Sequence, residues 1–85
     1  MFVIEDESHA EIFDEFDSLD KAKEQLRLWA KIPWDEPPNR APCTSWRTCG
    51  RSFEIVEYAD PRPPYEVLSR VAVLEVSKAG VRWLA

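Results

Sequence analysis

Two cysteines, Cys43 and Cys49, carry the most reactive side chains in this chain of 85 residues. Thiols can form a disulfide, act as nucleophiles or bind a soft metal ion. Five residues separate the two, which fits neither the Cys-x-x-Cys motif of thiol oxidoreductases nor the paired motifs of zinc ribbons. We therefore expect two buried or half-buried free thiols, with a disulfide or a redox or metal switch at Cys43 and Cys49 as the alternatives.

His9 is the only histidine, so no other imidazole could act as the base for a cysteine nucleophile or as a nitrogen ligand for zinc. It lies in an acidic run, and the pattern places it in a hairpin turn, where we expect it to be solvated. The acidic run lacks the ligand spacing and the glycine of an EF-hand loop. The sequence therefore assigns no catalytic residue, no metal site and no cofactor, and it does not predict an enzyme.

Arginine and tryptophan are concentrated in one segment, at Trp34, Arg40, Trp46, Arg47 and Arg51. Guanidinium and indole groups together suit the recognition of carboxylates, phosphates or planar rings, and both residue types are enriched at interface hot spots. These five residues form the candidate ligand or partner site, within which Arg47 and Arg51 could clamp an anion. In the alternative interpretation, the tryptophans anchor the core and the arginines pair with carboxylates of the first hairpin or of the helix.

Charge is spread unevenly along the chain, whose formal net charge is −5. Residues 1–20 hold eight acidic side chains and neither lysine nor arginine, whereas residues 37–53 hold three arginines and no carboxylate. The two segments could face each other, or the acidic hairpin could simply be solvated.

The negative net charge opposes general binding to nucleic acid, and neither a signal peptide nor a membrane-spanning run appears. We therefore expect a cytoplasmic protein that binds neither nucleic acid in general nor a membrane.

A change of hydrophobic period indicates the first elements that position these residues. A short apolar run at residues 2–4 is followed, over residues 10–16, by apolar residues at even spacing with carboxylates between them, which predicts a β-hairpin with one solvated face. Apolar residues then recur at steps of three and four, so we predict an amphipathic helix over about residues 18–32. Asp17 or Ser18 can cap its start, and Pro33 requires it to end.

Strands and one unusual loop account for the rest of the chain. Residues 33–50 lack a regular period but are rich in Pro, Trp, Cys and Arg, which predicts an ordered loop. Strands are expected at 51–58, 67–76 and 81–84, the second of them in mid-sheet because it is apolar on both faces. The result is a single α+β domain over residues 1–85, with one amphipathic helix packed on an antiparallel sheet of about five strands in the order β-β-α-β-β-β. One helix covers only one sheet face, so the other could serve association.

Four stretches of the central segment form a recognisable pattern: Ile32-Pro33-Trp34-Asp35, Pro38-Asn39, Ala41-Pro42-Cys43 and Thr44-Ser45-Trp46-Arg47-Thr48-Cys49-Gly50-Arg51. Together they resemble the signature of a family of short, uncharacterised bacterial proteins. The resemblance implies a bacterial, cytoplasmic protein, and it brings no activity with it.

The expected function is that of a small non-enzymatic interaction module, which binds a protein partner or a second copy of itself. This expectation rests on the Arg and Trp side chains of the central segment and on the lack of any nucleotide-binding, acyl-transfer or zinc-hydrolase motif. The alternatives are a small-ligand or anion-binding protein that uses Arg47 and Arg51, or a switch at the two cysteines.

Overall fold

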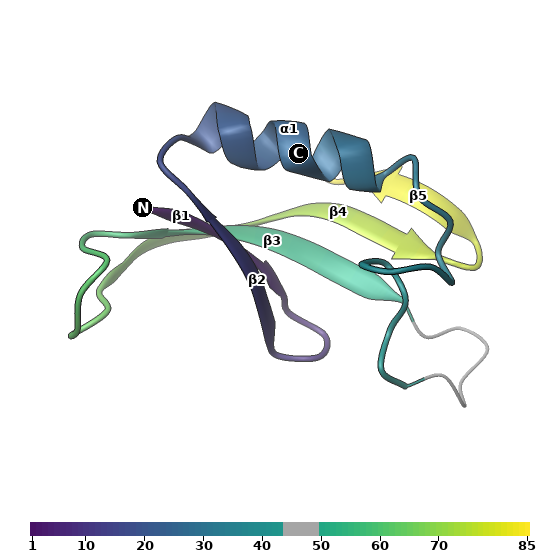
Figure 1. Ribbon diagram of the computed structural model, residues 1–85, viewed down its shortest axis with the longest axis horizontal. Coiled ribbons are helices and arrows are strands. Elements are labelled where there is room, and N and C mark those ends of the chain that lie inside the picture. The colour runs from purple at the N-terminus through teal and green to yellow at the C-terminus, as the bar shows by residue number, and fades with distance from the viewer. Residues whose placement is uncertain (44–49) are drawn as a thin grey trace.

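A single helix lies across one face of a five-stranded antiparallel sheet in the computed structural model, which describes residues 1–43 and 50–85 (Figure 1). The elements along the chain are β1 (Phe2–Asp6), β2 (Glu11–Phe16), α1 (Leu19–Trp29), β3 (Arg51–Tyr58), β4 (Val67–Ser77) and β5 (Gly80–Trp83). Within the sheet the strand order is β2-β1-β3-β4-β5, and every neighbouring pair is antiparallel. The predicted α+β fold and its order β-β-α-β-β-β are therefore confirmed.

The helix α1 begins where the sequence predicts and ends three residues earlier. Ser18 is the N-cap, and its hydroxyl accepts a hydrogen bond from a backbone amide of the first turn. The last helical residue is Trp29, because the chain tightens before Pro33. The buried Asn39 side chain then donates to the carbonyls of Trp29 and Ile32, both at 2.8 Å, so two carbonyl groups near the helix end are satisfied from the loop.

The core lies between α1 and the sheet face that it covers. Buried side chains of the helix stripe pack against buried side chains of the strands: Ala22, Leu26, Trp29, Ile4, Phe53, Ile55, Val73, Leu74 and Val76. Among the described residues, no helix is both long enough and apolar enough to cross a membrane.

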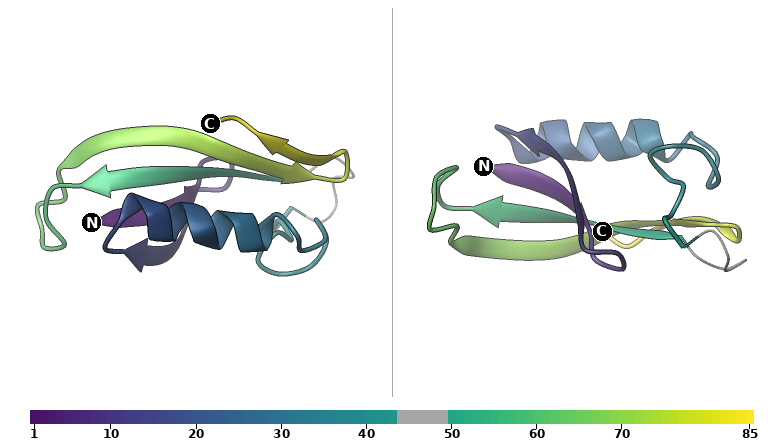
Figure 2. Two further views of the ribbon diagram at one scale, coloured as in Figure 1. Left: turned by 90° about the horizontal axis from the view of Figure 1, so that it is seen from above. Right: turned by 60° about the horizontal axis from the view of Figure 1, so that its bottom comes forward.

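Strand β4 differs from the prediction, because only its second half has a strand on both sides. The short strand β5 pairs with Leu74–Ser77 and leaves the first part of β4 beside β3 alone. Figure 2 shows β5 running along only one end of β4. Residues 67–71 are all exposed. The mid-sheet position thus holds for residues 74–77, and the rest of β4 is an edge.

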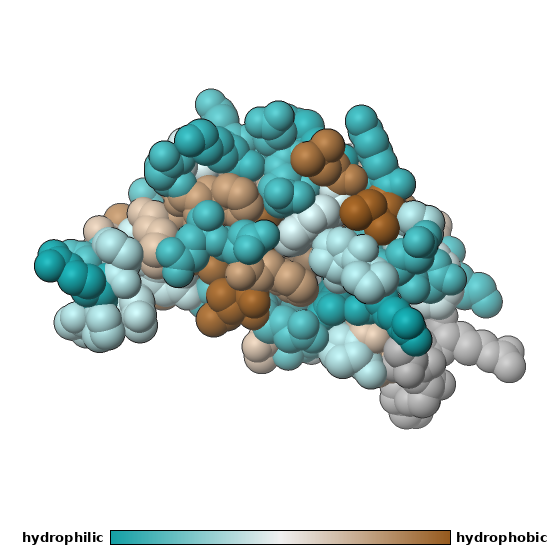
Figure 3. All heavy atoms as spheres, in the orientation of Figure 1, coloured by the Kyte–Doolittle hydropathy of each residue, from teal (hydrophilic) through white to brown (hydrophobic). Residues whose placement is uncertain are grey.

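Hydrophobic side chains on the face seen in Figure 1 form small separate patches among hydrophilic ones (Figure 3).

The backbones of β3 and β4 pack closely where β3 starts beside the end of β4. A Cβ atom on Gly50 would lie 2.4 Å from the carbonyl oxygen of Val76, so this position has no room for a side chain.

Candidate functional site

Asp6, the last residue of β1, is a fully buried carboxylate at the centre of a polar cluster. One carboxylate oxygen, Oδ1, accepts from the backbone amides of Ser8 at 3.0 Å and Ser52 at 3.1 Å. The other oxygen, Oδ2, lies 2.9 Å from Arg51 Nη1 and 2.6 Å from His9 Nδ1. The carboxylate therefore joins the hairpin turn to the start of β3, through two backbone amides, a guanidinium and a ring nitrogen.

Arg51, the first residue of β3, is buried against this carboxylate and closes the cluster. Its Nη1 also lies 2.8 Å from Glu11 Oε1, and the guanidinium carbon lies 5.2 Å from the centre of the Phe13 ring. Its remaining nitrogens donate to loop carbonyls, Nε to Pro38 at 3.2 Å and Nη2 to Arg40 at 2.7 Å. A single guanidinium thus connects β1, β2, β3 and the loop after the helix.

His9 is held between the buried carboxylate and a sulfur atom, and the prediction that it is solvated is wrong. Only 13% of its side chain is exposed. Its Nδ1 faces Asp6, and its Nε2 lies 2.9 Å from Sγ of Cys43. The hairpin turn reverses at Ala10, whose φ of 53° is left-handed, and this geometry leaves His9 beside the strand end that carries Asp6.

Cys43 is disulfide-bonded, which corrects the expectation of free thiols. Cys43 follows a loop segment that is fixed by hydrogen bonds from the Asn39 and Arg51 side chains. The only other cysteine in the chain, Cys49, lies outside the described residues.

The charge state of the cluster follows from competition between burial and hydrogen bonding. Burial of Asp6 favours its neutral form, but hydrogen bonds from Arg51, His9 and the Ser52 amide outweigh burial and hold its pKa below the ordinary 3.8. For Arg51, burial likewise opposes the charged form, and its hydrogen bonds to Glu11 and Asp6 raise the pKa of the guanidinium nonetheless. Both groups are therefore ionised at neutral pH.

We expect the stability that Asp6 contributes to be lost on acidification. In the unfolded chain its carboxyl titrates near about pH 3.9, and in the fold its pKa is lower. Between these two values the unfolded chain binds a proton that the folded chain does not, so a falling pH favours unfolding. In urea titrations, the difference in unfolding free energy between wild type and Asp6→Asn should be constant above about pH 5 and shrink below about pH 4.

Asp17, which is exposed, and Asp60, which is half-buried, also have lowered pKa values, from hydrogen bonds donated by Lys21 and Arg62. Both proteins contain these two carboxylates, so their contributions cancel. A difference between wild type and Asp6→Asn that stayed constant down to about pH 2 would contradict the role assigned to this carboxylate.

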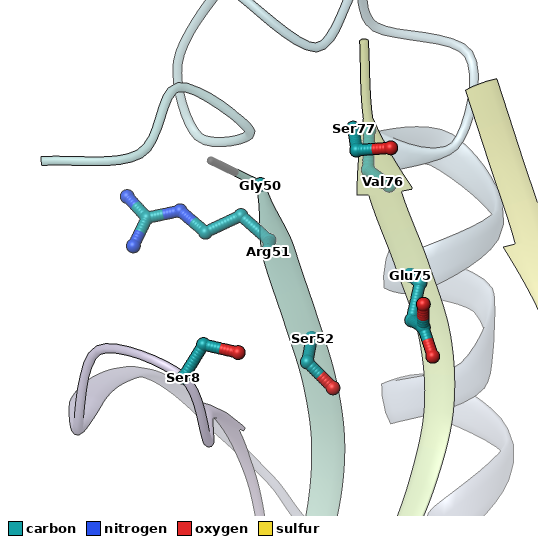
Figure 4. A pocket seen from close by; sticks show the side chains of 7 residues that line it. All are labelled: Ser8, Gly50, Arg51, Ser52, Glu75, Val76 and Ser77. Atoms are coloured by element: carbon teal, nitrogen blue, oxygen red, sulfur yellow. The ribbon is translucent and has the colours of Figure 1, made fainter. Parts of the chain in front are cut away.

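An open pocket of about 340 Å³ adjoins the cluster between the hairpin turn, the start of β3 and the end of β4 (Figure 4). The Arg51 side chain extends from β3 away from β4, while the Ser8 hydroxyl points toward β3. Polar groups dominate the lining, which comprises Ser8, Gly50, Arg51, Ser52, Glu75, Val76 and Ser77. A small polar molecule could therefore approach the turn that carries His9.

The structure separates the residues that the sequence grouped as a candidate ligand or partner site. Trp34 is half-buried and packs against the core, and the side chain of Arg40 is exposed while its carbonyl accepts from Arg51. The predictions for Trp46 and Arg47, like that for Cys49, fall outside the described residues.

Sequence reasoning missed Asp6 and His9 as members of the site. One signal could have located the ion pair: an arginine-bearing segment without carboxylates and an acidic hairpin without cations are complementary. No local pattern links His9 to Cys43, since 34 positions separate them.

Chemically, the cluster is a line of three groups in the order carboxylate, imidazole and sulfur, with an arginine fixing the carboxylate. Within residues 1–43 and 50–85, no group of three or more His, Cys, Asp or Glu side chains is arranged to hold a metal ion. Comparisons with protein-family models, curated proteins and solved structures found no match to this chain.

Proposed function

We propose that this protein is a thiol–disulfide switch in which Cys43 is the redox-active residue and His9 serves as its acid and base. The observation that carries the proposal is the line of contacts from Asp6 Oδ2 to His9 Nδ1, at 2.6 Å, and from His9 Nε2 to Cys43 Sγ, at 2.9 Å. A carboxylate that faces Nδ1 requires a proton on that nitrogen, so Nε2 is the atom that can exchange a proton with the sulfur.

A disulfide that only braces the fold does not need an imidazole against its sulfur. Exchange of a disulfide, in contrast, becomes faster when the departing sulfur is stabilised as it leaves. A carboxylate as deeply buried as Asp6, fixed by two backbone amides and Arg51, keeps the imidazole in one orientation. The arrangement therefore supports a labile disulfide rather than a purely structural one.

The reaction balances with a low-molecular-weight monothiol as reductant. His9 Nε2 takes the proton of the monothiol, and the resulting thiolate attacks the sulfur bonded to Cys43 and forms a mixed disulfide there. Cys43 leaves with the electron pair of the broken bond and receives that proton from Nε2. A second monothiol molecule then attacks the small-molecule sulfur of the mixed disulfide. The bond to the protein sulfur breaks, that sulfur leaves with the electron pair and ends as a thiol with the proton of the second monothiol, and the oxidised small-molecule disulfide is released. In sum, one protein disulfide and two thiols give two protein thiols and one small disulfide, and the reverse reaction closes the switch.

Opening this disulfide would leave most of the fold intact. Hydrogen bonds hold the loop up to Arg40 without the help of the disulfide. The Asn39 side chain donates to carbonyls at the helix end, and Arg51 donates to the carbonyls of Pro38 and Arg40. A change at Cys43 is therefore confined to the chain near the disulfide. The cytoplasmic location expected from the sequence fits this proposal, since cytosolic disulfides are usually transient and catalytic or redox-sensing.

We expect His9→Gln to slow the opening of the disulfide by glutathione on the order of 100-fold, at the low end of general acid and base effects. The non-reduced protein is mixed with glutathione, samples are quenched by alkylation, and intact mass gives the fraction opened with time.

Glu7→Gln is the matched control, because it changes an exposed side chain in the same turn, outside the pocket lining, and keeps the amide that donates to the Ser52 carbonyl. Its rate should equal that of wild type. Alkylation of Cys43 in Cys49→Ser, with and without His9→Gln, repeats the test on the thiol alone. Equal rates with and without the imidazole, or an intact mass that reduction leaves unchanged, would refute the proposal.

An anion-binding function has less support, because four protein groups already occupy the Arg51 guanidinium. An interaction module is the second candidate function, and the observation that favours it is the open edge of β4.

A further inference from the structure

A second cavity, of about 240 Å³, lies on the sheet face that α1 leaves uncovered. Ile4 belongs to the core under the helix, so its neighbour Val3, which lines the cavity, points to the opposite face. The connection from β3 to β4 bends away from α1 in Figure 1 and supplies another wall. The lining comprises Met1, Val3, Ile12, Glu15, Tyr58 and Tyr65.

Two tyrosine rings form a corner in this lining. The ring centres of Tyr58 and Tyr65 lie 6.1 Å apart and the ring planes are inclined by 72°, so the rings are not stacked in parallel. The face of an aromatic ring carries negative electrostatic potential and attracts cations. Two rings at such an angle can contact one small cation from different directions.

Glu5 holds one of these rings in place. Its carboxylate accepts a hydrogen bond from the Tyr58 hydroxyl at 2.5 Å, and this bond, together with burial, raises the pKa of Tyr58. The phenol therefore stays protonated at neutral pH. Donation to a carboxylate also makes the ring richer in electrons, which favours contact with a cation.

The charges around the cavity also favour a cation. Glu15 contributes an exposed carboxylate to the lining, and among the described residues neither lysine nor arginine lines the cavity. The Met1 ammonium group is already directed to the backbone, since it donates to the Tyr58 carbonyl at 3.2 Å. Outside the lining, Arg70 Nη1 contacts Glu5 but divides its charge with a second carboxylate, that of Glu54.

We propose that this cavity binds a small quaternary ammonium ion such as choline. The tyrosine rings contact the methylated head group, Glu15 supplies the opposite charge, and Val3 and Ile12 supply apolar contact. A quaternary ammonium has no N–H group to leave without a hydrogen bond in a mostly apolar cavity, whereas a primary ammonium is strongly hydrated.

The size of the cavity sets the size of the ligand. Ordinary ligand pockets measure about 300–1,000 Å³, so a cavity of about 240 Å³ suits a small head group. The site shares no residue with the cluster at Asp6, so it does not depend on the proposed disulfide switch.

Titration of the full chain with choline, followed by backbone amide NMR spectra, tests this proposal. We expect a dissociation constant on the order of 1 mM, as for a ligand of few atoms, with the shifts concentrated at the lining residues. Two probes separate charge from shape: the uncharged isostere with a tert-butyl group in place of trimethylammonium, and ethanolamine, which has a primary ammonium. Each should bind at least about fivefold more weakly than choline.

Tyr65→Leu, which removes a 57% exposed ring but keeps an apolar side chain, should weaken choline binding at least about fivefold. Glu15→Gln should weaken it about twofold or more. Tyr65→Phe, which keeps the ring, and Glu24→Gln, on the exposed side of α1, are the matched controls and should bind like wild type.

The amide spectra also verify that each variant is folded. The proposal would be overturned by any of four results: no shifts well above the expected dissociation constant, shifts centred away from the lining, either probe binding as tightly as choline, or unchanged affinity in Tyr65→Leu or Glu15→Gln.

Discussion

Replacing Asp6 with alanine is expected to lower the free energy of unfolding by about 3–5 kcal/mol, the usual cost of removing one partner from a buried ion pair. The change leaves Arg51 buried, with Glu11 as its remaining carboxylate. It also removes the acceptor of the Ser8 and Ser52 amides. For 85 residues the whole free energy of unfolding is on the order of 4–13 kcal/mol, so little stability would remain.

Urea unfolding of the non-reduced proteins at pH 7, at one fixed protein concentration, measures this loss. Glu11→Gln is the control, because it removes the other carboxylate of Arg51 from a side chain that is 37% exposed. A partly solvated pair of this kind is worth about 1 kcal/mol or less. If Asp6→Ala cost no more than Glu11→Gln, the burial of Asp6 would not have the importance that its contacts indicate.

The fold was predictable from the sequence because its signals are local. The buried residues of α1, Ala22, Leu26 and Trp29, lie at steps of four and three, and Ser18 directly precedes the helix. In the first hairpin the change from period two to period 3.6 separates strand from helix. These patterns depend only on neighbouring residues, and the structure confirms the elements that they predict.

The extent of exposure on β4 was not predictable in the same way. Val67 and Val71 suggest a central strand by composition alone, yet they lie on the edge because β5 is only four residues long. Whether a residue of β4 has a pairing strand on its second side depends on the length of β5, which is set by another part of the sequence. A composition that suits a buried strand suits an association edge equally well.

The site was not predictable because its members come from distant parts of the chain. Asp6 and Arg51 are 45 positions apart, and His9 and Cys43 are 34 apart. Composition could indicate that opposite charges would meet, but not which carboxylate would be buried. That selection follows from register: the strand β1 ends at Asp6, directly opposite Phe53 on β3, and so places the carboxylate beside the start of β3.

A group of three aromatic rings lies next to the ionic cluster, and one of the rings contacts Arg51. Phe13, Trp29 and Phe53 pack with ring centres 5.3 to 5.6 Å apart, and Phe13 in turn lies under the Arg51 guanidinium. The rings come from β2, α1 and β3, so the cluster joins the helix to the sheet at the same point where the ion pair joins the strands.

Phe53→Ala is therefore expected to lower the free energy of unfolding by about 3–5 kcal/mol, because Phe53 is fully buried and its removal opens a cavity below Phe13. Phe53→Leu, which refills part of that volume, should lose less. Ile12→Ala, on β2 and 69% exposed, should stay within about 0.5 kcal/mol of wild type in the same urea titrations. A loss for Phe53→Ala as small as that for Ile12→Ala would mean that the aromatic cluster does not carry the contact between helix and sheet.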